Sequence, residues 1–399
     1  MNIADFSREY LLLGLRINKH IEGFVDSYYG PKELSAIIQQ EEKQTPKNLL
    51  ETVNKLIQAL PDQSLIAERH RFISKSLSAM KTTTEILLGE NIDYLDRVHR
   101  LFDIRPEKTS ESHLVDTVEQ LDELYDGKGS LVERIEAERE SKTISIENAE
   151  PIMLKALSIT RDKTSETFSK LLPIDENVEV QIVTNEPWSA YNWYLGNYKS
   201  RIDVNTDLPL EWDQILNFAS HEGYPGHHTE HSVKEKCLYI DENRFEHAIL
   251  LILAPEAVIS EGIANTGLDV IFPNEQRRME IEIENFRPNP SDTPLEVLIK
   301  RVKCMNELFK LSGNLAIYAH VDGRTDDEIF DYCSRELNIP YTKERLHQWM
   351  KFIRNPLWAP YIFTYSHGEA LIRRKFGEKP SPRDFSSLLT HSILPSDLE

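Results

Sequence analysis

The feature that most constrains this chain is a 3.6-residue spacing of apolar residues, which recurs over most of its 399 residues. Such stripes are typical of amphipathic helices that bury one face. The first stripe consists of Phe6, Tyr10, Leu13, Ile17 and Ile21. The pattern changes near residue 173, where the segments 178–188 and 197–209 alternate apolar and polar residues and predict two short strands. The sequence therefore predicts a mainly α, multi-helical fold with one small β-sheet.

The change of pattern also suggests how the chain is organised. We expect an N-terminal helical region, 1–172, followed by a region, 173–399, that carries the unusual chemistry described below. No Pro/Gly/Ser-rich linker marks the boundary. One continuous helical body divided by a cleft is therefore an equal alternative.

Charge and composition exclude several classes of protein. The net charge is −20, from 66 acidic and 46 basic residues, which argues against a broad surface for nucleic acid or anionic lipid. The three cysteines form no CxxC motif, which is typical of reduced thiols in the cytoplasm. No secretory signal and no apolar run of about 18 residues is present. We expect a cytoplasmic protein with no nucleic-acid or membrane partner, whose oligomeric state the sequence does not indicate.

Residues 220–231 read SHEGYPGHHTEH and contain four histidines and two glutamates. Two histidines four residues apart on a helix can share one Zn²⁺, and a glutamate beside one of them can take a proton from water. His221 and Glu222 begin such an HExxH motif, but Pro225 stands where the second histidine belongs. Because proline fits poorly inside a helix, the chain must depart from a regular helix here.

Two arrangements restore a pair of ligands. In the favoured one, the chain bulges at the Pro-Gly pair and returns His227 or His228 to the place of the second ligand. In the alternative, the proline begins a new helix. His227 and His231 then lie four residues apart, with Glu230 between them as in HxxEH.

The stretch HEGYPGHH (221–228) is similar to the HExxPGHH signature of the prokaryotic proteins grouped as domain of unknown function 885. Further agreement lies in DSYYGPKEL (26–34), WYLGNYKSRIDVNTDLP (193–209), SEGIANTGLD (260–269) and YSHGEAL (365–371). The resemblance spans nearly the whole chain. It implies a zincin-like metallopeptidase fold with the small sheet beside the active-site cleft. It also favours His221 and Glu222, because both lie in the shared signature.

Glu261 is the expected third metal ligand. It lies in the otherwise apolar stretch LLILAPEAVISEGIA, where a carboxylate costs free energy unless it is paired or bound to metal. Asn265 follows four residues later and is placed to orient Glu261. Glu256, five residues earlier, points roughly 140° away on a helix.

Other residues are candidates for binding substrate. The strand 200–205 precedes the motif and is the expected edge onto which an extended peptide adds. Asn205 would hydrogen-bond the substrate backbone there, and Arg201 is a further substrate-binding candidate on the same strand. Arg373 or Arg374 would bind a terminal carboxylate through two parallel hydrogen bonds.

A developing oxyanion needs a hydrogen-bond donor, and Tyr365 and His367 are the candidates for this catalytic role. Gly368 beside them is expected to allow a close approach of two helices.

These residues together predict a zinc-dependent metallohydrolase, most simply a peptidase. His221, His227 or His228, and Glu261 would hold the metal, and Glu222 would be the general base and then the proton donor. The main alternative is a non-catalytic helical protein that binds peptides or acts as a scaffold and retains a vestigial metal site. A third interpretation keeps the metal but hydrolyses an amide or ester bond in a small molecule.

Overall fold

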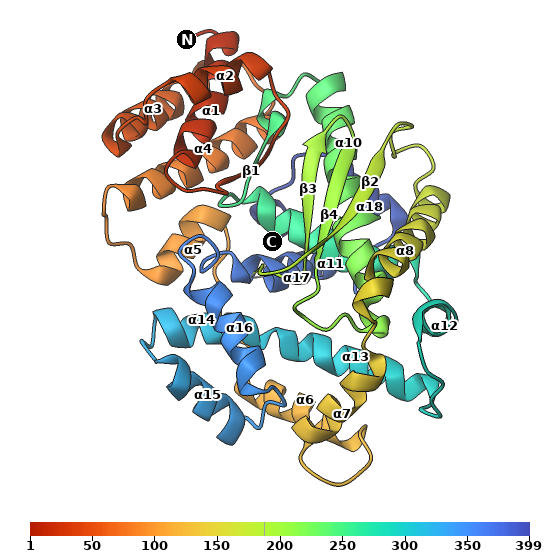
Figure 1. Ribbon diagram of the computed structural model, residues 1–399. Coiled ribbons are helices and arrows are strands. Elements are labelled where there is room, and N and C mark those ends of the chain that lie inside the picture. Colours follow the sequence, from red (N-terminus) through yellow and green to blue (C-terminus); the bar gives the residue numbers. More distant parts are fainter. Residues whose placement is uncertain (187) are drawn as a thin grey trace.

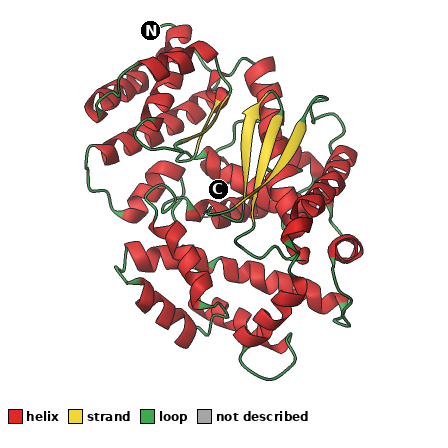
Figure 2. Cartoon of the chain, viewed as in Figure 1, coloured by secondary structure: helices red, strands yellow, loops and turns green. Residues whose placement is uncertain are grey.

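The computed structural model describes residues 1–186 and 188–399. The protein is mainly helical, with 64% of its residues in helices and 8% in strands, as the sequence predicts (Figure 2). The strands form two small sheets rather than one. Among the described residues, no helix combines the length and the apolar character needed to cross a bilayer.

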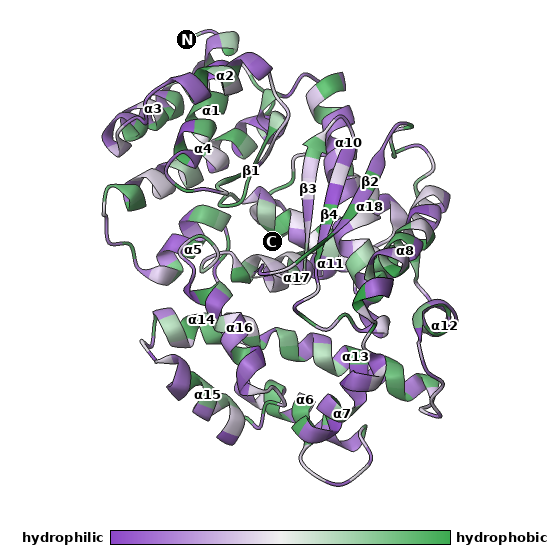
Figure 3. Cartoon of the chain, viewed as in Figure 1, coloured by the Kyte–Doolittle hydropathy of each residue, from purple (hydrophilic) through white to green (hydrophobic). Residues whose placement is uncertain are grey.

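The helices of the first part of the chain are amphipathic, and Figure 3 shows hydrophobic and hydrophilic residues interspersed along them. Their bounds are α1 Ile3–Asn18, α2 Lys32–Gln40, α3 Pro46–Ala59, α4 Ala67–Leu87, α5 Tyr94–Phe102, α6 Glu111–Glu123, α7 Leu131–Lys142 and α8 Ile146–Thr167. The ends follow local chemistry: the side chain of Thr45 accepts a hydrogen bond from the Asn48 amide and so caps α3. Gly89, with φ of +87°, follows the end of α4.

The larger sheet has three strands, in the order β2-β4-β3 (Figure 1). They are β2 Asn177–Val183, β3 Ala190–Gly196 and β4 Lys199–Asn205. The central strand, β4, pairs parallel with β2 and antiparallel with β3. The prediction that the strand at 200–205 is a free edge is therefore wrong, because both of its sides are already paired. The edges of this sheet are β2 and β3.

The second sheet joins segments from the two predicted regions of the chain. β1 (Val25–Tyr28) pairs antiparallel with β5 (Ile249–Leu251). β1 also contacts the outer edge of β3, because Ser27 Oγ donates a hydrogen bond to the carbonyl of Tyr194 at 2.5 Å. The two sheets therefore lie side by side, with β1 covering one end of β3.

The second half of the chain returns to helices after the larger sheet. Their bounds are α9 Ile215–Phe218, α10 His227–Lys234, α11 Glu256–Ile271, α12 Glu275–Phe286, α13 Leu295–Phe309, α14 Leu311–His320, α15 Asp326–Arg335, α16 Lys343–Arg354, α17 Ile362–Phe376, α18 Pro382–Thr390 and α19 Pro395–Leu398. All three cysteines are free thiols.

Helices α11 and α17 cross at the centre of the molecule with their backbones in contact (Figure 1). A Cβ atom added at Gly368 would lie 2.0 Å from the carbonyl oxygen of Val258 and 2.7 Å from the Gly262 nitrogen. Gly262 faces the Gly368 backbone at a similarly short distance, 2.6 Å. The close approach expected at Gly368 is thus confirmed.

The variant Gly368→Ala should lower the free energy of unfolding by about 3 kcal/mol, because the added methyl group meets backbone atoms that no side-chain rotation can move. Chemical denaturation measures the change. Ala370→Ser, which adds one atom on the exposed face of the same helix, is the control and should stay within about 0.5 kcal/mol of the wild type. Equal unfolding midpoints for both variants would contradict the close helix contact.

Candidate metal centre

The helical path is interrupted by a bulge between His221 and His227. The segment Ala219–Gly223 forms a π-helical turn, and α10 begins at His227 after the Tyr-Pro-Gly stretch. The Gly226 amide donates to the Ser220 carbonyl at 2.9 Å. A Cβ atom at this glycine would lie 2.0 Å from the His221 carbonyl oxygen, so only glycine fits there. This bulge brings the rings of His221 and His227 to a centroid distance of 4.8 Å, which is the favoured arrangement of the two predicted from the sequence.

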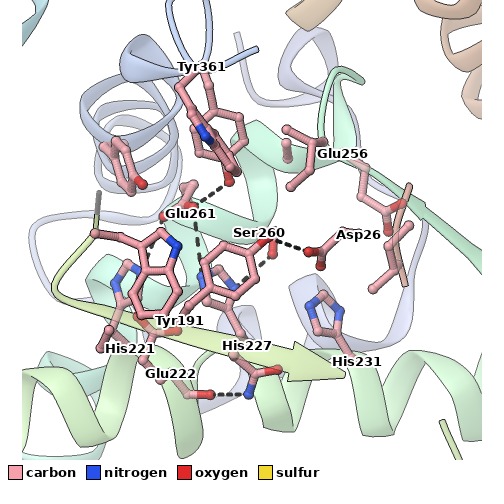
Figure 4. A pocket seen from close by; sticks show the side chains of 18 of the residues that line it. Asp26, Tyr191, His221, Glu222, His227, His231, Glu256, Ser260, Glu261 and Tyr361 are labelled. Atoms are coloured by element: carbon pink, nitrogen blue, oxygen red, sulfur yellow. Dashed lines mark hydrogen bonds and ion pairs between the residues drawn. The ribbon is translucent and has the colours of Figure 1, made fainter. Parts of the chain in front are cut away.

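Both histidines face Glu261, which projects from α11 (Figure 4). His221 Nε2 lies 3.3 Å from Glu261 Oε2, and His227 Nε2 lies 3.8 Å from Oε1. The three donor atoms lie within 4.8 Å of one another. Glu261 is only 3% exposed, and its Oε2 accepts no hydrogen bond from the described residues. Two imidazoles and a carboxylate are a usual ligand set for a catalytic Zn²⁺.

The hydrogen bonds behind the two rings determine which nitrogen of each ring faces Glu261. Asn265 donates its amide nitrogen to the Tyr365 carbonyl, so its oxygen accepts from His221 Nδ1 at 3.1 Å. Ser260 donates its single proton to Glu230 at 2.6 Å, so its oxygen accepts from His227 Nδ1 at 3.1 Å. Each neutral ring therefore carries its proton on Nδ1 and presents the Nε2 lone pair. Asn265 orients a histidine, whereas the sequence analysis expects it to orient Glu261.

The buried negative charge of Glu261 determines which of the two histidines is protonated. Burial by itself lowers the pKa of His221, but the Glu261 and Glu222 carboxylates outweigh it and raise that pKa to about 9. Burial lowers the pKa of His227 to about 4. Burial raises the pKa of Glu261, yet its contacts with the two imidazoles leave that pKa below its usual value. In the metal-free protein a proton on His221 thus neutralises Glu261, and metal binding must displace it.

The alternative group, His227 with Glu230 and His231, is also present, and its donor atoms also lie within 4.8 Å of one another. Both oxygens of Glu230 are already engaged, because Oε1 pairs with Lys234 Nζ at 2.7 Å and Oε2 accepts from Ser260. The buried ammonium supplies the positive charge that a metal ion would bring. The first group is therefore the better metal site.

His228 does not join either group, so the structure corrects its candidacy as a ligand. Its Nδ1 lies 2.9 Å from Ser200 Oγ and its Nε2 lies 3.0 Å from Glu176 Oε2. Burial by itself raises the pKa of Glu176. The hydrogen bonds from His228 and Tyr224 outweigh burial and lower that pKa to about 2. The arrangement resembles a Ser–His–acid triad, yet Ser200 is 1% exposed and His228 is inaccessible. It stabilises the core.

Glu222 lies on the wall of the same pocket and is 7% exposed. The amide of Asn192 in β3 donates to its backbone carbonyl at 2.6 Å and so holds the turn against the sheet. Burial raises the pKa of the Glu222 carboxyl to about 7, and the charges of Glu261 and Asp26 act in the same direction. A carboxyl with such a pKa is suited to take up and release a proton near neutral pH.

The pocket contains functional groups that the sequence analysis missed. The hydroxyl of Tyr361, just before α17, donates to Glu261 Oε1 at 2.5 Å and helps to orient that carboxylate. Asp26 lines the pocket from β1 and accepts a hydrogen bond from the Tyr191 hydroxyl. Burial raises the pKa of Asp26 to about 6. Tyr365, which the sequence did indicate, also lines the pocket.

Four other predicted residues lie outside the pocket. Asn205 is 3% exposed, and its amide donates to the Glu186 and Trp188 carbonyls at 2.9 Å. It therefore shapes the loop that places Trp188 in the pocket wall instead of binding substrate.

Arg201 forms two hydrogen bonds with Asp203, at 2.8 and 3.0 Å, and so has its own carboxylate partner on β4. His367 Nδ1 lies 3.1 Å from the Phe363 carbonyl of its own helix. Arg374 is exposed on α17, and the neighbouring Arg373 pairs with Asp269 and Glu369. These contacts do not support substrate-binding roles for the arginines or a catalytic role for His367.

Replacing Lys234 with methionine should destabilise the protein by about 3–5 kcal/mol, because it leaves two buried carboxylates without their shared cation. Burial lowers the pKa of Lys234, but Glu230 and Glu256 outweigh it and raise that pKa, so the ammonium stays charged. Denaturant unfolding at neutral pH measures the change. The control is Lys236→Met, whose half-exposed ammonium pairs with Asp241 at 3.7 Å, and its cost should stay below about 1 kcal/mol. Similar losses for both variants would contradict this account.

Comparison with known proteins finds a similar fold and gives no information about function. No protein-family model matches the chain. No curated protein matches it either. One solved structure, described as that of the putative lipoprotein from Colwellia psychrerythraea, aligns with 92% of this chain and 68% of its own, with a TM-score of 0.51 and 14% identity. At that identity the likeness shows a shared fold alone.

Proposed function

We propose that the protein is a zinc-dependent hydrolase that cleaves peptide bonds, with a metal held by His221, His227 and Glu261. The observation that carries the proposal is the pair of Nδ1 hydrogen bonds, to Asn265 and Ser260, which turn both Nε2 lone pairs toward one buried carboxylate. Histidines that bind a metal almost always donate their other ring N–H to a partner of this kind. Glu261 Oε2, which accepts no hydrogen bond from the described residues and has His221 Nε2 3.3 Å away, also fits a cation between the two groups.

The donor set fits zinc, because two neutral imidazoles and a carboxylate leave one position open in a tetrahedral site. When bound, zinc would polarise the scissile carbonyl and lower the pKa of water. The HExxPGHH resemblance points to the same zincin-like chemistry. A cytoplasmic location is part of the proposal and agrees with the three free thiols.

Glu222 is the proposed general base. It follows His221 in the chain and lines the same pocket, and among the described residues it forms no ion pair with a lysine or an arginine. In its ionised form it would take a proton from the attacking water. It would then deliver that proton to the leaving amine, so that it ends each cycle ionised.

The substrate would lie along β3, whose outer edge faces the pocket at Ala190, Tyr191 and Asn192. An extended peptide can add to such an edge through backbone hydrogen bonds. The Tyr365 hydroxyl, which lines the same pocket from α17, is the proposed donor to the developing oxyanion. Burial raises its pKa well above the usual value, so it keeps its proton at neutral pH.

The first test is metal content. Wild-type protein dialysed against zinc should retain about one equivalent, measured by mass spectrometry of the metal, and His221→Ala and Glu261→Gln should lose it. His231→Ala is the matched control, because this histidine lines the same pocket but belongs to the alternative group. Ser260→Ala should weaken zinc binding roughly 10- to 100-fold by releasing the His227 ring.

Zinc that persists in His221→Ala would refute the proposed ligand set. Loss of zinc only in His231→Ala would move the metal to the alternative group.

The second test is turnover. A mixed peptide library should be cleaved by the zinc-loaded protein, and Glu222→Gln should lower the rate at least about 100-fold without changing zinc content. Glu179→Gln, on the exposed face of β2, is the control for the change of charge. Bound peptides that neither protein cleaves would favour the alternative of a binding protein with a vestigial metal site.

A further inference from the structure

One end of the candidate pocket is lined by the small β1–β5 sheet. β5 and the residue after it contribute Leu250, Leu251 and Ile252 to the wall. The Ser27 hydroxyl ties β1 to the Tyr194 carbonyl and so blocks the outer edge of β3 beyond Asn192. A peptide that adds to β3 can therefore extend past the metal group only a short way before it meets β1.

The residue that β1 presents at this end is Asp26 (Figure 4). Its carboxylate accepts a hydrogen bond from Tyr191 and forms no ion pair with any described residue. Two other acids of the pocket differ, because Glu256 pairs with Lys234 at 3.0 Å and Glu261 faces two imidazoles. Glu222, the proposed base, resembles Asp26 in having no lysine or arginine partner among the described residues. No lysine or arginine lines the pocket among the described residues. Asp26 thus provides a negative charge that the protein itself leaves without a cation.

His231 is a second, independent sign of a ligand at this end. Its side chain is 8% exposed, and its Nδ1 is buried without a hydrogen-bond partner among the described residues. Figure 4 shows its ring pointing into the same space as Asp26. A buried nitrogen of this kind usually has a partner, so a bound polar group is expected beside it.

We propose that this end of the pocket binds the free α-ammonium group of a peptide, with Asp26 as its counter-charge. The inference rests on the proposed hydrolase function and narrows its substrates to peptides cleaved near their amino terminus. A carboxyl terminus would meet an acid and find no arginine or lysine to bind it. β1 occupies the edge of β3 beyond Asn192, so the backbone of a peptide bound to β3 would have to end there. This favours the amino terminus of a peptide over a lysine side chain as the group beside Asp26.

The test compares matched peptides with the zinc-loaded protein. N-acetylation of a good substrate should lower kcat/KM roughly 30-fold or more, because it removes the charge that Asp26 binds. Asp26→Asn keeps an acceptor for Tyr191. It should lower kcat/KM for the free-amine peptide by a similar factor, and change the acetylated peptide less than about two-fold. Asp175→Asn, an exposed aspartate, is the control for the change of charge.

A second readout needs no turnover. The zinc-loaded Glu222→Gln protein should bind the free-amine peptide more tightly than its acetylated form, by calorimetry, and Asp26→Asn introduced beside it should abolish the difference. Equal use of both peptides by the wild type would overturn the inference while leaving the hydrolase proposal intact. If acetylated peptides are cleaved rapidly, but only next to a lysine, then Asp26 binds a lysine side chain instead of the α-ammonium group. This result would also overturn the inference. Absence of both zinc binding and cleavage would instead refute the proposed function.

Discussion

The contact between Gly226 and the His221 carbonyl is the constraint on which the candidate site depends. It lets the chain form a tight bulge between the π-helical turn and α10 and place two imidazoles side by side, where a regular helix would need a histidine at position 225. A side chain at residue 226 would push the two helical segments apart. The same device recurs at Gly262 and Gly368, where backbone contact between α11 and α17 sets Glu261 beside Tyr361. Close backbone packing at two glycine contacts thus defines the positions of the proposed ligands.

Buried charge is distributed so that each acid near the site has a distinct role. Glu230 and Glu256 share the ammonium of Lys234, which joins α10 to the start of α11 and already compensates the charge of Glu230. Glu261 is left to the two imidazoles. Since an unpaired buried carboxylate is costly, this division explains why two similar His–Glu groups in one pocket differ in their capacity for metal.

The sequence predicts the helical class, the bulge and the acid in α11 because each depends on local pattern or on one costly buried charge. It cannot distinguish His227 from His228, because both follow the glycine and only the packing of Ser200 and Glu176 decides which ring turns inward. The sequence also does not predict the order of the strands. The sequence analysis expects β4 to be an edge strand, but β3 pairs with it on the side expected to be free.

Tyr361 and Asp26 are missed for a related reason. A tyrosine just before a helix and an aspartate in a short strand have no local signature, and their roles follow from which elements the fold brings together. Asp26 lies in the DSYYGPKEL stretch, which carries the family resemblance, and that is the one signal that pointed to its segment.

The pocket draws one wall from residue 26 and another from residues 361 and 365. During synthesis, a chain that has not yet reached those tyrosines lacks the hydroxyl that orients Glu261 and the face opposite β3. A ribosome-bound fragment therefore carries the histidines without the machinery around them. If the protein cleaves peptides, its own nascent chain and its neighbours are protected until the segment with those tyrosines has been made and folded.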